Sequence, residues 1–175
     1  MAEQDLVGGR YRLLRVIGAG GMGRVWLAED ELLGRRVAAK EIRTPAGATA
    51  SLDLQLATMR EARAAARLDH PGVVHVYDVV WRPGTSWIVM EYVPSRSLQE
   101  ALPLPHRDAA RIGLGVLAAL RVAHAAGVVH GDVKPHNVLL AEDGRVVLSD
   151  FGLARVEGSD PAPEVAFGSP HYVAP

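Results

Sequence analysis

The chain has 175 residues, 49% of them hydrophobic and 22% charged, which is typical of a globular protein and excludes a wholly disordered one. Its 19 Lys and Arg nearly balance 20 Asp and Glu, so no net charge favours a nucleic acid or an anionic membrane as partner. The absence of cysteine excludes disulfides and thiolate metal sites. Because there is no leader-like start and no apolar run of about 18 residues, we expect a cytoplasmic chain without a membrane segment.

The first third of the chain predicts an antiparallel meander. After a polar tail over residues 1–10, β-prone runs alternate with glycine-rich or turn-forming segments. The predicted strands are Tyr11–Gly18, Arg24–Ala28 and Arg36–Ile42.

The loop between the first two strands carries three glycines, Gly18, Gly20 and Gly23. This spacing alone is a weak signal that dinucleotide-binding folds share, but those folds need a helix after the third glycine, and Val25–Leu27 is β-prone instead. One interpretation is a flap whose backbone amides cover nucleotide phosphates, since glycine lets the main chain approach closely. The other is an ordinary glycine-rich hairpin.

A helix is predicted over Leu52–Leu68. Three arginines recur on one side of it at spacings of three and four, and they indicate a solvated face or, alternatively, a docking surface. They are Arg60, Arg63 and Arg67. Glu61 lies on the opposite, inward stripe, where a carboxylate needs a partner, and Lys40 in the third strand is the candidate. The alternative is a Glu at the rim of the helix.

The rest of the chain changes from strands to helices near residues 91–94, which we take as the domain boundary. Before it lie two further predicted strands, and after it come two helices and a short hairpin, followed by an irregular stretch over residues 155–167. The predicted elements are the strands Val73–Val80 and Ser86–Val89, the helices Leu98–Ala101 and His106–Ala126, and the hairpin strands Val138–Leu140 and Val146–Leu148. Five apolar positions give the longer helix its inward face: Ile112, Val116, Ala119, Leu120 and Ala123.

The segment VVHGDVKPHNVLL, from Val128 to Leu140, contains the closest grouping of potentially catalytic side chains in the sequence. It contains Asp132, Lys134 and Asn137, and the predicted hairpin brings Asp150 close to them. A carboxylate can accept a hydroxyl proton, a lysine can neutralise a phosphoryl group, and Asn and Asp supply oxygen ligands for magnesium. The pattern favours phosphoryl transfer.

Taken together, these motifs resemble the protein kinase family, and most closely the eukaryotic-like serine/threonine kinases of bacteria, over Tyr11–Pro175. The resemblance implies an α+β, two-lobed fold with an antiparallel sheet and one main helix in the N-lobe and a mainly helical C-lobe. It places the N-lobe at residues 11–90, the hinge at 91–93 and an incomplete C-lobe at 94–175.

The resemblance also implies ATP as the phosphoryl donor, Mg²⁺ as its metal, and a set of ATP-binding residues. The glycine-rich loop corresponds to Ile17, Gly18, Ala19, Gly20, Gly21, Met22, Gly23, Arg24 and Val25. Lys40 resembles the lysine that binds the α and β phosphates, with Glu61 as its helix partner. Ala38, Glu91 and Val93 resemble the residues around adenine, the last two lying in the hinge.

Within the central segment, Asp132 resembles the catalytic base and Lys134 the phosphate-contacting lysine, while Asn137 and Asp150 resemble the metal ligands. Lys134 also favours a protein substrate with a Ser or Thr acceptor over a tyrosine. Ser169 stands where the family usually has Thr, in the substrate pocket, and its hydroxyl is expected to bond Asp132 and Lys134.

Two departures from the family pattern affect these expectations. Gly131 replaces the Arg before the catalytic Asp, so no cation is ready there to bind a phosphate on the activation segment. We therefore hypothesise that activity does not depend on phosphorylation of that segment, and that Ser159→Ala leaves it intact. The family's Ala-Pro-Glu motif is interrupted after Pro175, so we expect a C-terminally truncated catalytic domain.

Several alternatives stay open at this point. Gly131 and the missing helices favour a nucleotide-binding pseudokinase, a regulatory module or an inactive kinase fragment. A small-molecule phosphotransferase of related fold is disfavoured by Lys134. His130 and His136 flank Asp132 and allow a transition-metal site, but His130 is expected to pack near Phe151 instead. The tryptophans are expected to pack on the sheet rather than form a ligand cage: Trp26, Trp81 and Trp87.

Overall fold

The computed structural model describes residues 6–20, 23–43, 59–60, 62–82, 85–151, 155–156 and 172. The chain divides into two compact units, which are described separately below. The first unit contains Met1–Ala62 and Val76–Tyr92, and the second contains Arg63–His75 and Val93–Pro175. The chain therefore crosses between the units three times, after Ala62, after His75 and after Tyr92.

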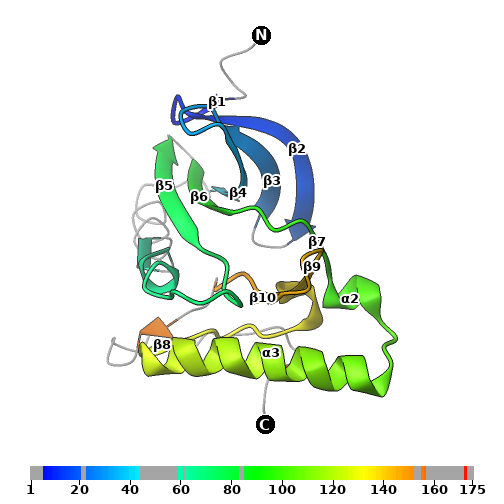
Figure 1. Ribbon diagram of the computed structural model, residues 1–175. Helices are drawn as coiled ribbons and strands as arrows, with labels where there is room; N and C mark the ends of the chain where they lie inside the picture. Colours follow the sequence, from blue (N-terminus) through cyan, green and yellow to red (C-terminus); the bar gives the residue numbers. More distant parts are fainter. Residues whose placement is uncertain are drawn as a thin grey trace. The chain divides into compact units, whose positions relative to one another are not determined.

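The first unit is built on one antiparallel sheet with the strand order β1-β2-β3-β4-β6-β5 (Figure 1). Its strands are β1 (Leu6–Val7), β2 (Tyr11–Gly20), β3 (Gly23–Asp30), β4 (Arg35–Arg43), β5 (Val76–Arg82) and β6 (Thr85–Glu91). The predicted meander is confirmed as β2, β3 and β4. Leu6 and Val7, which the sequence placed in the tail, form the short edge strand β1 on Tyr11 and Arg12.

The sheet is strongly curved, and its two edge strands approach each other. The Arg82 guanidinium on β5 donates a hydrogen bond to the Leu6 carbonyl on β1. A Cβ on Gly8 would lie 2.8 Å from Val80 Cγ1, so only glycine lets the two edges meet this closely. The concave face encloses a core of Val7, Tyr11, Ala28, Val37, Ala39, Trp87 and Val89. Trp87 therefore packs in the sheet core, as expected, and Trp26 packs against the same cluster. Trp81, which was expected to pack on the sheet as well, is exposed on the edge strand β5.

A buried ion pair closes the end of this core. Asp30, at the end of β3, has no exposed surface. Arg10 donates two hydrogen bonds to its carboxylate, from Nε to Oδ1 and from Nη2 to Oδ2, both at 2.7 Å. The Leu33 amide donates to Oδ1 at 3.3 Å, and Arg35 Nε lies 3.6 Å from Oδ2. The Arg35 guanidinium also stacks 3.8 Å from the centre of the Tyr77 ring. These contacts tie the β1–β2 turn, which ends at Arg10, and the β3–β4 turn to strand β5.

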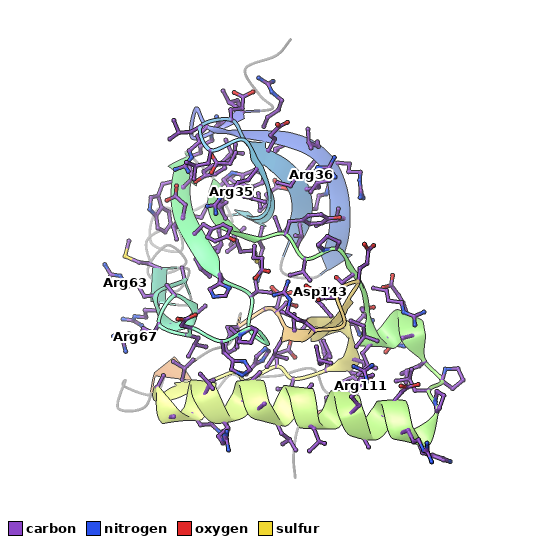
Figure 2. The ribbon with its side chains drawn as sticks, viewed as in Figure 1. Arg35, Arg36, Arg63, Arg67, Arg111 and Asp143 are labelled. Atoms are coloured by element: carbon purple, nitrogen blue, oxygen red, sulfur yellow. The ribbon has the colours of Figure 1, made fainter. Side chains whose placement is uncertain are left out.

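The opposite face of the sheet carries the second apolar cluster, made of Ile42, Ile88 and Ala62. Ala62 belongs to the helix predicted over residues 52–68, of which residues 59–60 and 62–65 are described and helical. Residues 52–58 and Glu61 lie outside the described residues. Arg60, Arg63 and Arg67 are all exposed, and Arg63 and Arg67 project away from the ribbon in Figure 2. The prediction of a solvated arginine face is confirmed for these three.

The second unit combines two helices with short strands (Figure 1). Its elements are β7 (Ser95–Ser97), α2 (Leu98–Ala101), α3 (His106–Ala125), β8 (Val128–Val129), the 3-10 helix η2 (Pro135–Asn137), β9 (Val138–Ala141), β10 (Val146–Leu148) and β11 (Arg155–Val156). Strands β10, β9 and β7 form one small sheet, and β11 pairs with β8. Two parts of the sequence reading were wrong. Arg155–Val156, expected to be irregular, is a strand, and the strand predicted from Val73 begins at Val76.

Helix α3 packs against β10 and supports the segment that precedes Asp150. Ile112, Ala119 and Ala123 are buried on its inner face, as the apolar spacing predicted, and Val116 and Leu120 are partly buried. A Cβ on Gly115 would lie 2.8 Å from Val146 Cβ, so the helix backbone packs directly on the Val146 side chain there. Among the described residues, no helix combines the length and hydropathy that a membrane span requires.

Candidate active site

The polar residues of the central segment form one cluster in the second unit. Asp132 is 7% exposed, and its Oδ2 accepts hydrogen bonds from Lys134 Nζ at 2.6 Å and from Asn137 Nδ2 at 3.2 Å. Asn137 Nδ2 also donates to the Asp132 carbonyl at 2.8 Å. A buried carboxylate is tolerated only when a cation and further donors compensate the lost hydration, and Lys134 and Asn137 do so here. The structure thus brings together three of the four residues that carry the predicted chemistry.

His130 holds the backbone of this cluster in place. Its Nδ1 accepts a hydrogen bond from the Asp132 amide at 3.2 Å, and its Nε2 lies 2.9 Å from the Ser149 carbonyl. An amide can only donate and a carbonyl can only accept, so the imidazole is neutral with its proton on Nε2. Burial lowers the pKa of His130 below its ordinary value, which favours this neutral form. The ring also packs against Phe151 with the centroids 4.5 Å apart, which confirms the structural role predicted for it.

The loop geometry depends on a 3-10 turn and on the β9–β10 hairpin. Pro135 begins η2, as its fixed φ and missing N–H allow, and the Asn137 amide closes the turn on the Lys134 carbonyl at 2.9 Å. On the other side of the hairpin, Ser149 bonds the Asn137 carbonyl with both its amide, at 2.9 Å, and its hydroxyl, at 3.2 Å. Asp150 therefore follows a residue that is anchored to the cluster.

Two residues of the site have left-handed backbones. Gly131 has φ 79°, a conformation that glycine adopts without steric penalty. Asp150 has φ 57°, and it is the one non-glycine residue with a positive φ among the described residues. Such a backbone costs about 1 to 3 kcal/mol outside glycine and concentrates at functional sites. We regard Asp150 as held in this conformation by its anchored neighbours Ser149 and Phe151.

The donor set suits a hard cation more than a transition metal. Asn137 directs its Nδ2 at Asp132, which leaves Oδ1 as the amide atom able to ligate a cation, and Asp150 offers carboxylate oxygens. In the described ranges, no three His, Asp or Glu side chains are grouped as a metal site would require. Oxygen donors of this kind fit Mg²⁺, which usually takes one or two protein ligands and completes its shell with phosphate and water.

The glycine-rich loop lies in the first unit as the hairpin between β2 and β3. Gly23 has φ 131°, and a Cβ there would lie 2.0 Å from the Glu41 carbonyl oxygen, so the sheet itself requires this glycine. Gly18 differs, because its Cβ would meet only Val25 at an ordinary 3.7 Å. The packing of the described residues gives no reason for glycine at residue 18.

The other residues that the resemblance assigned to ATP are placed as follows. Ile17, Ala19 and Arg24 are exposed on the hairpin strands, while Gly18, Gly23 and Val25 are partly buried. In β4, Ala38 and Lys40 are 6% and 5% exposed and face the same side of the sheet as Ile42. Glu91 ends β6 in the first unit, and Val93 is buried in the second. Gly20 pairs with Gly23 at the end of β2. Gly21, Met22, Glu61 and Ser169 lie outside the described residues.

Sequence reasoning missed Ser149. Its carbonyl and hydroxyl join His130 to Asn137, and the only sequence signal was its place directly before Asp150. A Ser in a strand end carries no pattern of its own, so its partners become visible only when the hairpin is folded.

Comparison with known proteins agrees with this arrangement. The model of the family described as protein kinase domain matches residues 11–175. A probable serine/threonine-protein kinase of Streptomyces coelicolor is 42% identical over 167 residues, which cover 90% of this chain and 24% of the relative. The serine/threonine-protein kinase PrkC of Bacillus subtilis is 38% identical over 97% of this chain and 27% of its own length. PknA of Mycobacterium tuberculosis, also a serine/threonine-protein kinase, is 39% identical over 95% of this chain and 41% of its own length.

The chain therefore spans between 24% and 41% of the length of these relatives. The family match runs over all but the first 10 residues of the chain, through both compact units. It includes the glycine hairpin, Lys40 and the cluster around Asp132. The chain belongs to the protein kinase domain family.

Proposed function

We propose that the protein is a serine/threonine kinase that transfers the γ-phosphoryl group of Mg-ATP to a hydroxyl of a protein substrate. The observation that carries the proposal is the shared oxygen of Asp132, which receives both the Lys134 ammonium at 2.6 Å and the Asn137 amide at 3.2 Å. A base, a cation and a metal ligand are thereby held within one short loop. Phosphoryl transfer depends mainly on such positioning and on compensation of charge.

In this proposal Asp132 accepts a hydrogen bond from the acceptor hydroxyl and takes up its proton. Its low exposure and its bonds fix the direction of the carboxylate. Lys134 compensates negative charge on the γ-phosphoryl group, since an ammonium has three N–H donors and can bond a carboxylate and a phosphate oxygen together. Neither residue has to reorganise extensively during transfer.

Asn137 and Asp150 would hold magnesium. When bound, the ion neutralises phosphate charge and aligns the β and γ phosphates. The contribution of this chain is the orientation of the ligands: Asp132 fixes the Asn137 amide, and Ser149 fixes the backbone in front of Asp150.

The nucleotide would be bound by residues of the β2–β3 hairpin and of β4. We assign the cover of the phosphates to Ile17–Val25, because the backbone can approach a ligand closely at Gly18. Lys40, with Glu61, would bond the α and β phosphates, and Ala38, Glu91 and Val93 would surround adenine. We also assign Ser169 to the substrate pocket. We place the reaction in the cytoplasm, where ATP is available. Names of the relatives support a Ser or Thr acceptor.

Thermal unfolding with and without Mg-ATP tests the binding half of the proposal. A ligand that binds only the folded state raises the midpoint in proportion to saturation. We expect a rise that requires both nucleotide and magnesium, and that weakens when Lys40 is changed to Met. A midpoint that ignores Mg-ATP at every concentration would contradict the proposal.

Transfer of radiolabelled phosphate to a mixed-sequence Ser/Thr peptide pool tests the catalytic half. Asp132→Asn should lower transfer by about 10²- to 10⁴-fold, the usual contribution of a positioned base, and should preserve the Mg-ATP midpoint shift. Binding without transfer in the unaltered protein would favour a nucleotide-binding pseudokinase, to which Gly131 also points.

A further inference from the structure

Ser149 lies between the two residues that are assigned above as magnesium ligands. Its backbone leads directly into Asp150, and it bonds the Asn137 carbonyl oxygen twice, with its amide at 2.9 Å and with its hydroxyl at 3.2 Å. All three residues belong to the second unit. The positions of the two assigned ligands are therefore coupled through this one residue.

The β9–β10 hairpin requires the amide of Ser149 but not its hydroxyl. The last pair of the ladder is Val138 with Leu148, and the bond from the Ser149 amide to the Asn137 carbonyl extends the ladder by one position. Every residue except proline supplies such an amide. The hydroxyl adds a second donor to the same oxygen, which has two lone pairs. It therefore restricts the rotation of the Asn137 peptide, which a single hydrogen bond would leave freer.

Asn137 is held at nearly all of its polar atoms. Its backbone amide donates to the Lys134 carbonyl at 2.9 Å. Its Nδ2 donates to the Asp132 carbonyl at 2.8 Å and to Asp132 Oδ2 at 3.2 Å, and the residue is 5% exposed. The remaining polar atom, Oδ1, has no hydrogen bond to a described residue. Asn137 is thus fixed around the one atom that can ligate a cation.

The backbone that follows Ser149 also needs support. Asp150 has φ 57°, and a left-handed conformation outside glycine persists only where surrounding contacts impose it. Before Asp150, these contacts are the two bonds of Ser149 to Asn137 and the bond from His130 Nε2 to the Ser149 carbonyl at 2.9 Å. Loss of the hydroxyl should therefore loosen Asp150 as well as Asn137.

Rigid ligands distinguish a small cation from a larger one. Mg²⁺ requires near-ideal octahedral geometry at about 2.0 to 2.1 Å, whereas Ca²⁺ takes about six to eight oxygen ligands at about 2.3 to 2.6 Å in flexible arrangements. We propose that Ser149 is a positioning residue whose hydroxyl holds Asn137 and Asp150 in a fixed relation to each other and thereby selects Mg²⁺ over Ca²⁺. The inference rests on the metal ligands of the proposed function.

Nucleotide binding with each metal tests the inference without phosphoryl transfer. Isothermal titration calorimetry gives the Kd of a non-hydrolysable ATP analogue at Mg²⁺ or Ca²⁺ concentrations that saturate the nucleotide, and the ratio of the two Kd values measures selectivity. The unaltered protein should bind the Mg²⁺ complex more tightly. Ser149→Ala should weaken binding of the Mg²⁺ complex by about tenfold, the lower end of the effect of residues that orient a metal ligand, and that of the Ca²⁺ complex by less than about twofold.

A matched pair of variants separates the hydroxyl from the size of the side chain. Thr and Val have the same shape, so Ser149→Thr should keep the preference for Mg²⁺ and Ser149→Val should lose it. Ser95→Ala is the control, because it removes another serine hydroxyl that bonds a backbone carbonyl, that of Val93 at 2.9 Å, and it should leave the ratio unchanged. Equal weakening with both ions in Ser149→Val would overturn the inference. So would unfolding of both Ser149→Ala and Ser149→Val in circular dichroism, since the hydroxyl would then be part of the hairpin's stability.

A transfer assay on the same proteins separates this inference from the proposed function. If the unaltered protein prefers Mg²⁺ through the Ser149 hydroxyl but transfers no phosphate, the proposed function fails and the inference stands. If it transfers phosphate and Ser149→Val keeps the full preference for Mg²⁺, the proposed function stands and the inference fails. Nucleotide binding that depends on neither ion would overturn both.

Discussion

Each unit contains a buried carboxylate bound by a cation, and the two are bound differently. In the first unit, the Arg10 guanidinium donates a hydrogen bond to each oxygen of the Asp30 carboxylate. In the second unit, Lys134 and Asn137 share a single oxygen of Asp132, and the Lys134 side chain keeps 24% of its surface exposed. The bidentate pair fixes geometry most strongly, while the ammonium is a mobile point charge. The first arrangement suits a structural joint, and the second suits a group that has to meet a substrate.

This comparison predicts that Lys134 is the residue whose substitution has the largest effect on phosphoryl transfer relative to its effect on stability. Lys134→Met should lower phosphoryl transfer by about 10²- to 10³-fold, the usual effect of losing one electrostatic stabiliser. The free energy of unfolding should fall by about 1 to 3 kcal/mol, because the buried Asp132 carboxylate loses its cation and keeps the Asn137 amide. Single-turnover assays and urea unfolding measure the two quantities. A variant that unfolds readily would place Lys134 with Arg10 as a structural cation.

Asp30→Asn should show the reverse pattern. The change leaves Arg10 opposite an amide, and breaking a buried charged pair of this kind should remove about 3 kcal/mol from the free energy of unfolding. Turnover per folded molecule should stay within about twofold, because Asp30 belongs to the joint around β3. The folded fraction has to be measured in the same samples. A loss of turnover at full folding would show that the joint also controls the chemistry.

The same contrast extends to two glycines of the β2–β3 hairpin. Gly23→Ala should destabilise the first unit by roughly 1 to 3 kcal/mol, because the Cβ clashes with the Glu41 carbonyl at a positive φ. Gly18→Ala meets no clash and should leave unfolding unchanged within about 0.5 kcal/mol. If residue 18 contacts phosphates, Gly18→Ala should instead weaken Mg-ATP binding, which isothermal titration calorimetry measures. Equal nucleotide affinity would assign Gly18 to an ordinary hairpin.

The smallest expected effect is a pH dependence carried by His130. Burial lowers its pKa in the folded protein below the ordinary value of 6.5, so below that pH the unfolded chain binds the proton first. The free energy of unfolding should therefore fall as the pH decreases below about 6.5, until the folded imidazole is protonated as well. Urea unfolding over this pH range should show that the free energy of unfolding depends less steeply on pH in His130→Gln than in the unaltered protein. His124→Gln, at an exposed end of α3, should keep the original slope.

The sequence could predict the elements that have a local signal. The bounds of α2 and β10 agree with the structure because a capping box marks the start of the one and a short apolar run marks the other. Asp132, Lys134 and Asn137 could be expected together because the first and the last are only five positions apart in the sequence. The roles assigned to them, and to the residues of the hairpin, stay predictions until they are tested.

The features that the sequence could not predict depend on distant partners. Strand β7 is Ser-Arg-Ser, without apolar alternation, and it becomes a strand only because β9 supplies its hydrogen bonds. Asp30 stands in a segment that resembles a polar turn, and its burial depends on Arg10, twenty residues earlier. Glu61, Met22 and Ser169 were singled out from the sequence and lie outside the described residues. Local sequence patterns do not indicate contacts between distant residues, such as those of β7 with β9 and of Asp30 with Arg10.

The contact between Gly115 and Val146 sets a condition on how this family can vary. The helix and the strand are separated by a space that one side chain fills, and here Val146 fills it from β10 while residue 115 contributes none. A mutation that enlarges residue 115 is tolerated only when residue 146 becomes smaller, since overpacking a core costs about 1 to 3 kcal/mol. The two positions should therefore change together across related kinases. Their combined size sets the distance between α3 and β10, the strand that leads to Asp150.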